Sequence, residues 1–180
     1  LEAQVCILAA HLDIGSLVPQ LAPALISHAD QWLQVNYTQL PHDWQNPGFM
    51  FSMQHGHIWG TSLGGNWLRL GGAKFLRPMA GIEAKTAEYS ALINSHLISA
   101  FGNLFGSSVN QALTGQAFLD CRPCDELPII GPMYGEPRLL ISTGYLGSGM
   151  TLGFAAGKSL AELLHSGKSE GLPRQLWPER

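Results

Sequence analysis

The chain has 180 residues, of which 46% are hydrophobic and 13% charged, and its formal net charge is −3. This length is enough for one substantial core, and the nearly neutral charge gives no sign of a nucleic acid or an anionic membrane as partner. No apolar run reaches the roughly 18 residues of a membrane-spanning helix, and three cysteines are too few for a disulfide scaffold. We therefore expect a globular protein of a reducing compartment, the cytoplasm.

The N-terminal stretch opens on a short apolar run, QVCILAA at residues 4–10. A run of this kind predicts an inner strand of a parallel sheet. It ends in Ala9 and Ala10, whose small side chains would let a ligand approach the backbone. Because the chain opens close to a strand and without an initiator Met, we expect it to be the C-terminal part of a longer protein. The next predicted elements are a helical turn at 12–21, a strand at 28–37 and a loop at 41–47.

The pattern changes at Gly48, where three short apolar segments follow one another: FMFSMQHG, HIWGTSLGG and NWLRLGG. Each is rich in aromatic and branched residues and ends in glycine, which predicts an antiparallel meander. The aromatic residues of this region are more typical of sheet packing than of a substrate wall. An antiparallel sheet nevertheless leaves one face available for a ligand or a partner.

Residues 86–104 show the clearest helical periodicity of the chain, with Thr86 as the predicted N-cap and Gly102 or Gly106 near the end. A further strand is predicted at 111–119. Cys121 and Cys124 then form a CxxC. This pair lacks both a second pair of zinc ligands and the helix start that would activate a thiol, so we interpret it as coincidental and expect no metal site.

Residues 139–164 form a strand, a glycine turn and a helix in series. The run Leu139–Ile141 predicts a buried strand, and Gly144, Gly147 and Gly149 turn the chain into a helix that Ser148 or Thr151 could cap. A helix start presents free backbone N–H groups and a partial positive charge, which suits an electron-rich ligand. The alternative is a tight connection of an α/β sheet without a ligand.

The order of motifs toward the C-terminus resembles that of a known family. Arg122-Pro123, Asp125 and LPIIGP at 127–132 are followed by a strand, by GYLGSGMTL at 144–152 and by a long helix. This succession is similar to the C-terminal signature of the D-amino-acid oxidase superfamily of FAD-dependent enzymes. The resemblance covers residues 122–164 well and extends, less specifically, over nearly the whole chain.

The resemblance implies a fold and a division into domains. The implied fold class is α+β: an antiparallel substrate-binding domain flanked by the terminal strand and helix of an FAD-binding α/β domain. Residues 1–27 and 122–180 would belong to the FAD-binding domain and residues 28–121 to the substrate-binding domain. No G-x-G-x-x-G sequence follows a strand here, so the N-terminal Rossmann half would be missing.

The resemblance also implies a function: oxidation of a small amine or amino acid by hydride transfer to FAD. Arg122 would clamp the substrate carboxylate, and the 180-residue piece alone would be inactive. His11 stands where the family has a small glycine. The alternative is a degenerate module that keeps the fold and binds no flavin. The residues expected to contact FAD are Ala9, Ala10, Gly144, Tyr145, Gly147, Ser148, Gly149, Met150 and Thr151.

Overall fold

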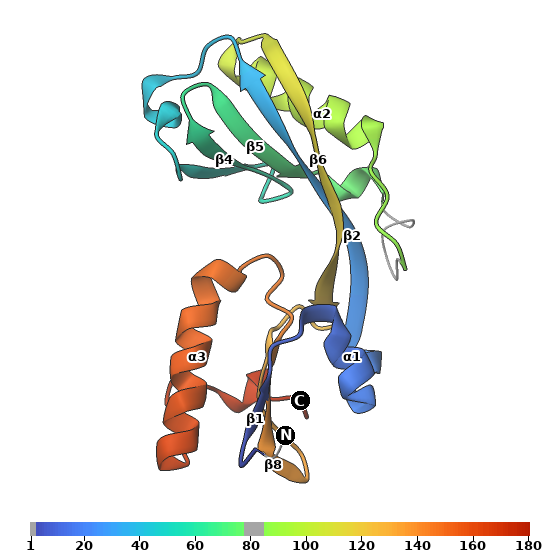
Figure 1. Cartoon of the computed structure of the whole chain (residues 1–180), viewed down its shortest axis with the longest axis vertical. Coiled ribbons are helices and arrows are strands. Elements are labelled where there is room, and N and C mark those ends of the chain that lie inside the picture. Colours follow the sequence, from blue (N-terminus) through green and yellow to red (C-terminus); the bar gives the residue numbers. More distant parts are fainter. Residues whose placement is uncertain (1–2, 78–84) are drawn as a thin grey trace. The chain divides into compact units, whose positions relative to one another are not determined.

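The computed structural model describes residues 3–77 and 85–180 and has a mixed α+β fold, as the sequence predicts. The chain divides into two compact units. The first unit comprises Leu1–His28 and Asp120–Arg180, and the second comprises Ala29–Leu119. Two long strands, β2 (Leu25–Tyr37) and β6 (Val109–Pro123), carry the chain across the boundary between the units (Figure 1). The assignment of FAD binding to one unit and substrate binding to the other stays a prediction.

The sheet of the first unit has the strand order β1-β8-β7. Strand β1 (Cys6–Leu8) runs parallel to β8 (Glu136–Thr143), and β7 (Ile129–Met133) forms an antiparallel hairpin with β8. The sequence predicted β1 as an inner strand. Among the described residues it lies at the edge of the sheet instead, and Ile7 is 49% exposed.

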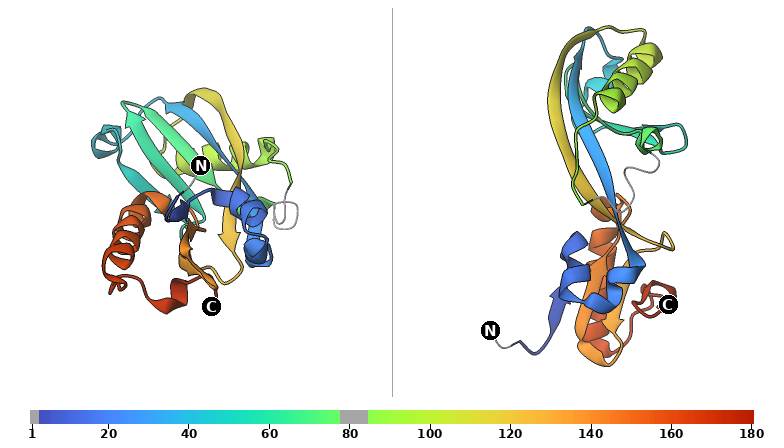
Figure 2. Two further views of the ribbon diagram at one scale, coloured as in Figure 1. Left: turned by 60° about the horizontal axis from the view of Figure 1, so that its bottom comes forward. Right: turned by 90° about the vertical axis from the view of Figure 1, so that its right-hand side faces the viewer.

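Helices cover both faces of this sheet. Helix α3 (Gly149–Ser166) packs on one face through Ala156 and Leu160, and α1 (Ile14–Leu17) with the 3-10 segments around it packs on the other. The alternation along β8 explains this division, since Leu140 faces α3 and Ile141 faces α1. Figures 1 and 2 show α3 and α1 on opposite sides of β8. The 3-10 segments of the first unit are His11–Asp13, Pro19–Ala24 and Arg174–Leu176.

The second unit is built on a sheet of strand order β3-β4-β5-β2-β6. The predicted meander is confirmed, because β3, β4 and β5 pair antiparallel in sequence order. Helix α2 (Ala91–Phe105) covers one face of this sheet, where Leu97 and Phe101 join a core with Leu33, Leu68 and Leu70 (Figure 2). The bounds of the remaining elements are Met50–Met53 for β3, Ile58–Gly64 for β4, Trp67–Gly72 for β5, and 3-10 segments at His42–Gln45 and Lys74–Leu76.

The predicted start of α2 was wrong, whereas its end was right. Ser90 is the N-cap and accepts a bond from the backbone N–H of Ile93, so Thr86 lies outside the helix. Gly106 ends the helix with a φ of +59°, a conformation that glycine adopts at little cost. No helix among the described residues has the length and apolar character needed to span a membrane.

Candidate functional site

The carboxyl ends of the two parallel strands β1 and β8 meet at one edge of the first unit's sheet. Ala9 and Ala10 follow β1, and Thr143 and Gly144 end β8. The hydroxyl of Thr143 donates a hydrogen bond of 3.1 Å to the backbone oxygen of His11, which ties the two strand ends together. This edge is where ligands bind in α/β sheets, because the strand-to-helix connections open there.

The glycine turn after β8 needs glycine for two different reasons. Gly144 has a φ of +72°, and a Cβ placed on it would lie 2.3 Å from Cγ of Pro123. Gly147 has a φ of +84°, but a Cβ on it would meet no atom within 4 Å. The first glycine therefore lets β8 pack against the end of β6, while the second leaves open space beside the backbone.

Helix α3 begins at Gly149 without a side-chain cap. Ser148 occupies the N-cap position, but its hydroxyl makes no capping hydrogen bond, and Thr151 lies inside the first turn. The structure confirms Ser148 as the N-cap residue, without a capping hydrogen bond from its side chain. The backbone oxygen of Ser148 accepts from the N–H groups of Thr151 and Leu152. The N–H groups of Gly149 and Met150 precede the first of these helical bonds and are suited to an external acceptor.

His11 and Asp120 form a polar contact beside the end of β1. His11 has a φ of +51°, and its Nε2 lies 3.2 Å from Oδ1 of Asp120. The same carboxylate accepts a 2.9 Å hydrogen bond from the backbone N–H of Cys121. These contacts hold the His11 ring against β6. Sequence reasoning missed this pair, because 109 residues separate its members.

Cys121 is buried and its thiol is reduced. Burial raises the pKa of this thiol, a hydrogen bond from Thr143 opposes part of the rise, and the nearby Asp120 carboxylate adds a smaller increase. The neutral thiol is a poor nucleophile. Cys124 is also a free thiol, so the CxxC pair forms no disulfide.

Arg122 lies on the last part of β6 and pairs with an acid that the sequence prediction did not consider. Its Nη2 is 2.8 Å from Oε1 of Glu126, and the two side chains are 40% and 68% exposed. An ion pair this exposed contributes little to stability. The two other acids close to Arg122 in sequence are engaged elsewhere, since Asp120 contacts His11 and Asp125 binds Arg180.

The Asp125 and Arg180 pair fastens the C-terminus to the turn after β6. The hydrogen bond from Arg180 lowers the pKa of Asp125 to about 2. The Arg180 guanidinium also donates to the backbone oxygens of Leu127 and Pro128. Glu126 is thereby left as the acid beside Arg122. The spacing of four residues between Arg122 and Glu126 was the only signal in the sequence that could have identified the pair.

All residues predicted to contact a cofactor belong to the first unit, in the segments that follow β1 and β8 and in the first turn of α3. Tyr145 is held there by a 2.6 Å hydrogen bond between its hydroxyl and that of Ser142. Arg122 stands next to Pro123, whose ring contacts Gly144. The structure therefore brings the predicted arginine and the predicted glycine turn together through neighbouring residues.

Helix α3 presents apolar side chains to solvent on the side away from the sheet. Met150 is 98% exposed and Phe154 is 86% exposed. Gly153 and Gly157 have no neighbouring atom within 4 Å of an added Cβ. A large exposed apolar patch of this kind is typical of a surface that another polypeptide covers.

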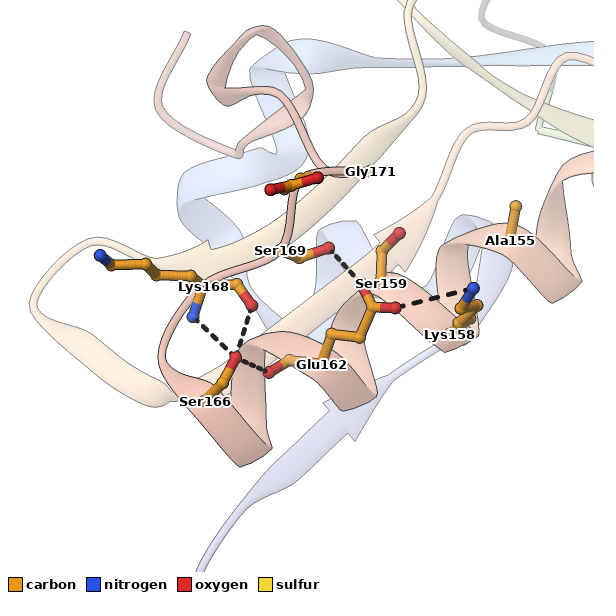
Figure 3. A pocket seen from close by; sticks show the side chains of 9 residues that line it. Ala155, Lys158, Ser159, Glu162, Ser166, Lys168, Ser169 and Gly171 are labelled. Atoms are coloured by element: carbon orange, nitrogen blue, oxygen red, sulfur yellow. Dashed lines mark hydrogen bonds and ion pairs between the residues drawn. The ribbon is translucent and has the colours of Figure 1, made fainter.

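A hollow of about 650 Å³ lies along the second half of α3, away from the glycine turn. Figure 3 shows the Glu162 carboxylate in contact with Lys158 and Ser169, whereas the ammonium group of Lys168 extends away from them. Glu162 contacts Lys158 at 3.8 Å and accepts a hydrogen bond from Ser169. Two lysines and two glutamates line the hollow, so its formal charges balance, and we assign it no role in the site.

Comparisons with solved structures find the same fold over the whole chain. Glycine oxidase from Geobacillus kaustophilus matches with a TM-score of 0.72 and 14% identity, over 100% of this chain and 46% of its own. L-proline dehydrogenase from P. horikoshii matches with a TM-score of 0.70 and 17% identity, over 98% and 46%. Iminodiacetate oxidase from Chelativorans sp. BNC1 matches with a TM-score of 0.67 and 15% identity, over 100% and 48%.

At these identities the matches establish the fold, and the chain spans about half the length of each of these proteins. A search of curated proteins finds no match to the chain. The model of the DAO family, described as FAD dependent oxidoreductase, matches residues 2–163. The chain therefore belongs to the DAO family of FAD-dependent oxidoreductases.

Proposed function

We propose that this chain is the C-terminal part of an FAD-dependent enzyme that oxidises a small amine or amino acid. The observation that carries the proposal is the glycine turn. It joins the end of β8 to the uncapped start of α3, at the same edge as Ala9 and Ala10. A strand, a turn and a free helix start in this order suit the electron-rich edge of a flavin.

The residues of this edge fit FAD, the cofactor of the family. Gly147 leaves open space beside its backbone, where a flat ring can approach without meeting a side chain. The N–H groups of Gly149 and Met150 and the positive end of the α3 dipole would stabilise negative charge at the N1/C2=O side of the ring. Bound FAD supplies the hydride acceptor, and the protein positions and electrostatically supports the reactants.

Arg122 is the residue that we propose for holding a substrate carboxylate. A guanidinium binds a carboxylate in a bidentate manner. Its present partner Glu126 is 68% exposed, so a substrate carboxylate replaces this contact at small cost. By holding the carboxylate, Arg122 would also orient the amine-bearing carbon for hydride transfer. Such orientation of the reactants lowers the activation barrier.

The remaining half of the dinucleotide-binding domain would cover the exposed side of α3. Two observations support this: Met150 and Phe154 are almost fully exposed, and the chain spans less than half of the matched oxidases and dehydrogenase. We place the complete protein in the cytoplasm, where three free thiols stay reduced. We expect this piece alone to bind FAD weakly and to be inactive.

The second candidate is a module that keeps the fold without binding flavin. It is favoured by His11, which adopts a φ of +51° directly after Ala10 and brings an imidazole to the cofactor edge. The contact of this ring with Asp120 weakens the case, because it holds the imidazole against β6.

Absorbance of the full-length protein separates the two candidates. We expect a stoichiometric flavin band near ~450 nm. Gly149→Val should remove the band, because a β-branched side chain would stand where the ring approaches. Ala155→Val, which makes a similar change at an exposed position of the same helix, should keep it. A wild-type protein that stays colourless after incubation with excess FAD would support the second candidate.

A further inference from the structure

A hollow of about 480 Å³ lies in the second unit, beside the start of helix α2. One of its lining residues is Ala29 of β2, which shares a sheet face with Gln31 and Leu33, the face that α2 covers. We call this cavity the α2 hollow. Its other lining residues are Arg77, Lys85, Thr86, Glu88, Tyr89 and Ser90.

Arg77 is held in the α2 hollow by neutral groups. Its Nη2 donates hydrogen bonds of 2.8 Å to Oε1 of Gln31 and of 2.5 Å to the backbone oxygen of Glu88. Gln31 is fully buried, and its amide also binds both backbone groups of Ser90. These contacts use both protons of Nη2, so Nε and the two protons of Nη1 are left as donors. The guanidinium is therefore fixed in place and still has unused donors.

The positive charge of the α2 hollow is not neutralised by its own acid. Neither Arg77 nor Lys85 forms an ion pair with any residue that the structure describes. Glu88 is the one acid among the lining residues named above, and Arg77 contacts its backbone oxygen and not its carboxylate. Two cations against one exposed acid give the lining a formal charge of +1.

Three hydroxyl groups add further donors to this lining. The Ser90 hydroxyl accepts a hydrogen bond from the backbone N–H of Ile93, and the Tyr89 hydroxyl accepts one from that of Gly115. Each of these hydroxyls keeps its own proton, which can be donated to a ligand. Thr86 contributes the third hydroxyl. The α2 hollow therefore combines a net positive charge with several separate donors.

This arrangement suits a phosphate group better than a carboxylate. An arginine grips a carboxylate through two parallel N–H groups on neighbouring nitrogens. Both forks of this kind include Nη2, and in Arg77 the protons of Nη2 are already used. A phosphate group instead presents three acceptor oxygens, which can take single hydrogen bonds from Arg77, Lys85 and a hydroxyl at the same time.

We propose that the α2 hollow is a binding site for the phosphate group of a small molecule. Arg77 and Lys85 would supply the charge, and Thr86 and Ser90 would donate to the remaining oxygen. The volume lies within the roughly 300–1,000 Å³ that is typical of small-molecule sites. Free phosphate offers the same chemistry, so it is one arm of the test. The α2 hollow lies wholly within the second unit, so it depends neither on the proposed function nor on a bound flavin.

Titration of the full-length protein with phenyl phosphate tests the proposal. The protein is labelled with 3-fluorotyrosine, and Tyr89→Phe identifies the fluorine signal of Tyr89, which lines the hollow. We expect phenyl phosphate to shift this signal to saturation, whereas benzoate, which carries a carboxylate on the same ring, should bind about tenfold or more weakly. Inorganic phosphate should also shift the signal, and its affinity relative to phenyl phosphate shows whether the organic group contributes. The signal of Tyr134, in the other unit, should stay in place.

Lys85→Gln and Arg77→Gln should each weaken the binding of phenyl phosphate by about tenfold. Arg77→Gln also loses the contacts with Gln31 and Glu88. Lys85→Gln loses no side-chain contact with the described residues, so it tests the site without disturbing the fold. Lys168→Gln is the matched control and should leave binding unchanged, since Lys168 is an exposed lysine of the other unit.

Three results would overturn the proposal: a Tyr89 signal that neither phosphate compound shifts, equal binding of benzoate and phenyl phosphate, or an unchanged affinity in Lys85→Gln. The flavin band reports separately on the proposed function.

Discussion

Gly144→Ala should destabilise the first unit strongly, because Gly144 meets both a backbone and a steric restriction. Its φ of +72° lies in the left-handed region, which costs about 1–2 kcal/mol for a residue with a Cβ. The new Cβ would lie 2.3 Å from Cγ and 2.8 Å from Cδ of Pro123. Overpacking of this kind costs about 1–3 kcal/mol. We expect a total loss of about 2–5 kcal/mol in the free energy of unfolding.

Gly147→Ala is the control for the backbone contribution. Its φ of +84° is similar, but the added Cβ meets no atom within 4 Å, so it should cost only about 1–2 kcal/mol. The steric contribution can be removed separately with Pro123→Ala, since only Cβ would remain at residue 123, at 3.8 Å. The Pro123→Ala and Gly144→Ala double variant should therefore be less destabilised than the sum of the two single variants.

The assay is urea unfolding of the full-length apoprotein followed by circular dichroism. Equal losses in the free energy of unfolding for Gly144→Ala and Gly147→Ala would refute the argument. They would show that Pro123 moves away from the added Cβ at no cost in free energy. Additivity in the double variant would refute it in the same way. In the holoprotein Gly144→Ala should also lose flavin, since the turn carries the proposed cofactor contacts.

Three further predictions concern chemistry. Arg122→Ala should lower kcat/KM for an amino acid by roughly a hundredfold while changing that of the matching simple amine little, and Arg122→Lys should recover part of the activity. Acid precipitation of the flavoprotein should leave a colourless pellet, because the buried Cys121, with its raised pKa, stays a thiol and forms no flavin link. Asp125 has a pKa lowered from 3.8 to about 2 in the folded state. Its stabilising contribution should be complete above pH ~4 and disappear as the pH falls toward ~2.

Each of these has a distinct contrary result. An equal fall for amino acid and amine in Arg122→Ala would make Arg122 a structural residue, and a yellow pellet would indicate covalent flavin. For the acid range, the stability of wild type and Asp125→Asn is compared at several pH values. A difference between them that stays constant from pH 5 to pH 2 would show that the Arg180 contact does not favour the carboxylate.

Local sequence patterns were enough to predict the parts of this protein that local conformation controls. The meander is encoded by short apolar segments ending in glycine, and the turn after β8 by Gly144 and Gly147, whose positive φ values few other residues adopt. Gly106 ends α2 for the same reason. The order of the motifs from Arg122 to Leu152 also indicated the family, which the match over residues 2–163 confirms.

Contacts between residues distant in sequence set the features that local sequence patterns do not specify, such as the start of α2. The N-cap of helix α2 is Ser90, and not Thr86, because Gln31 binds both the backbone N–H and the backbone oxygen of Ser90, at 2.8 and 3.0 Å. Gln31 is fully buried on β2, so its side-chain amide needs these partners. The preference of Thr86 for an N-cap position is too small to offset the free energy lost if this buried amide had no partner.

The partner of Arg122 was decided in the same way. Arg180 lies 55 residues beyond Asp125 and binds it, which leaves Glu126 as the acid for Arg122. Cross-strand register in the second unit likewise places Trp32 and Trp59 on either side of Gly71. Contacts between distant residues depend on which strands pair and in which register, and a single sequence does not specify these choices locally.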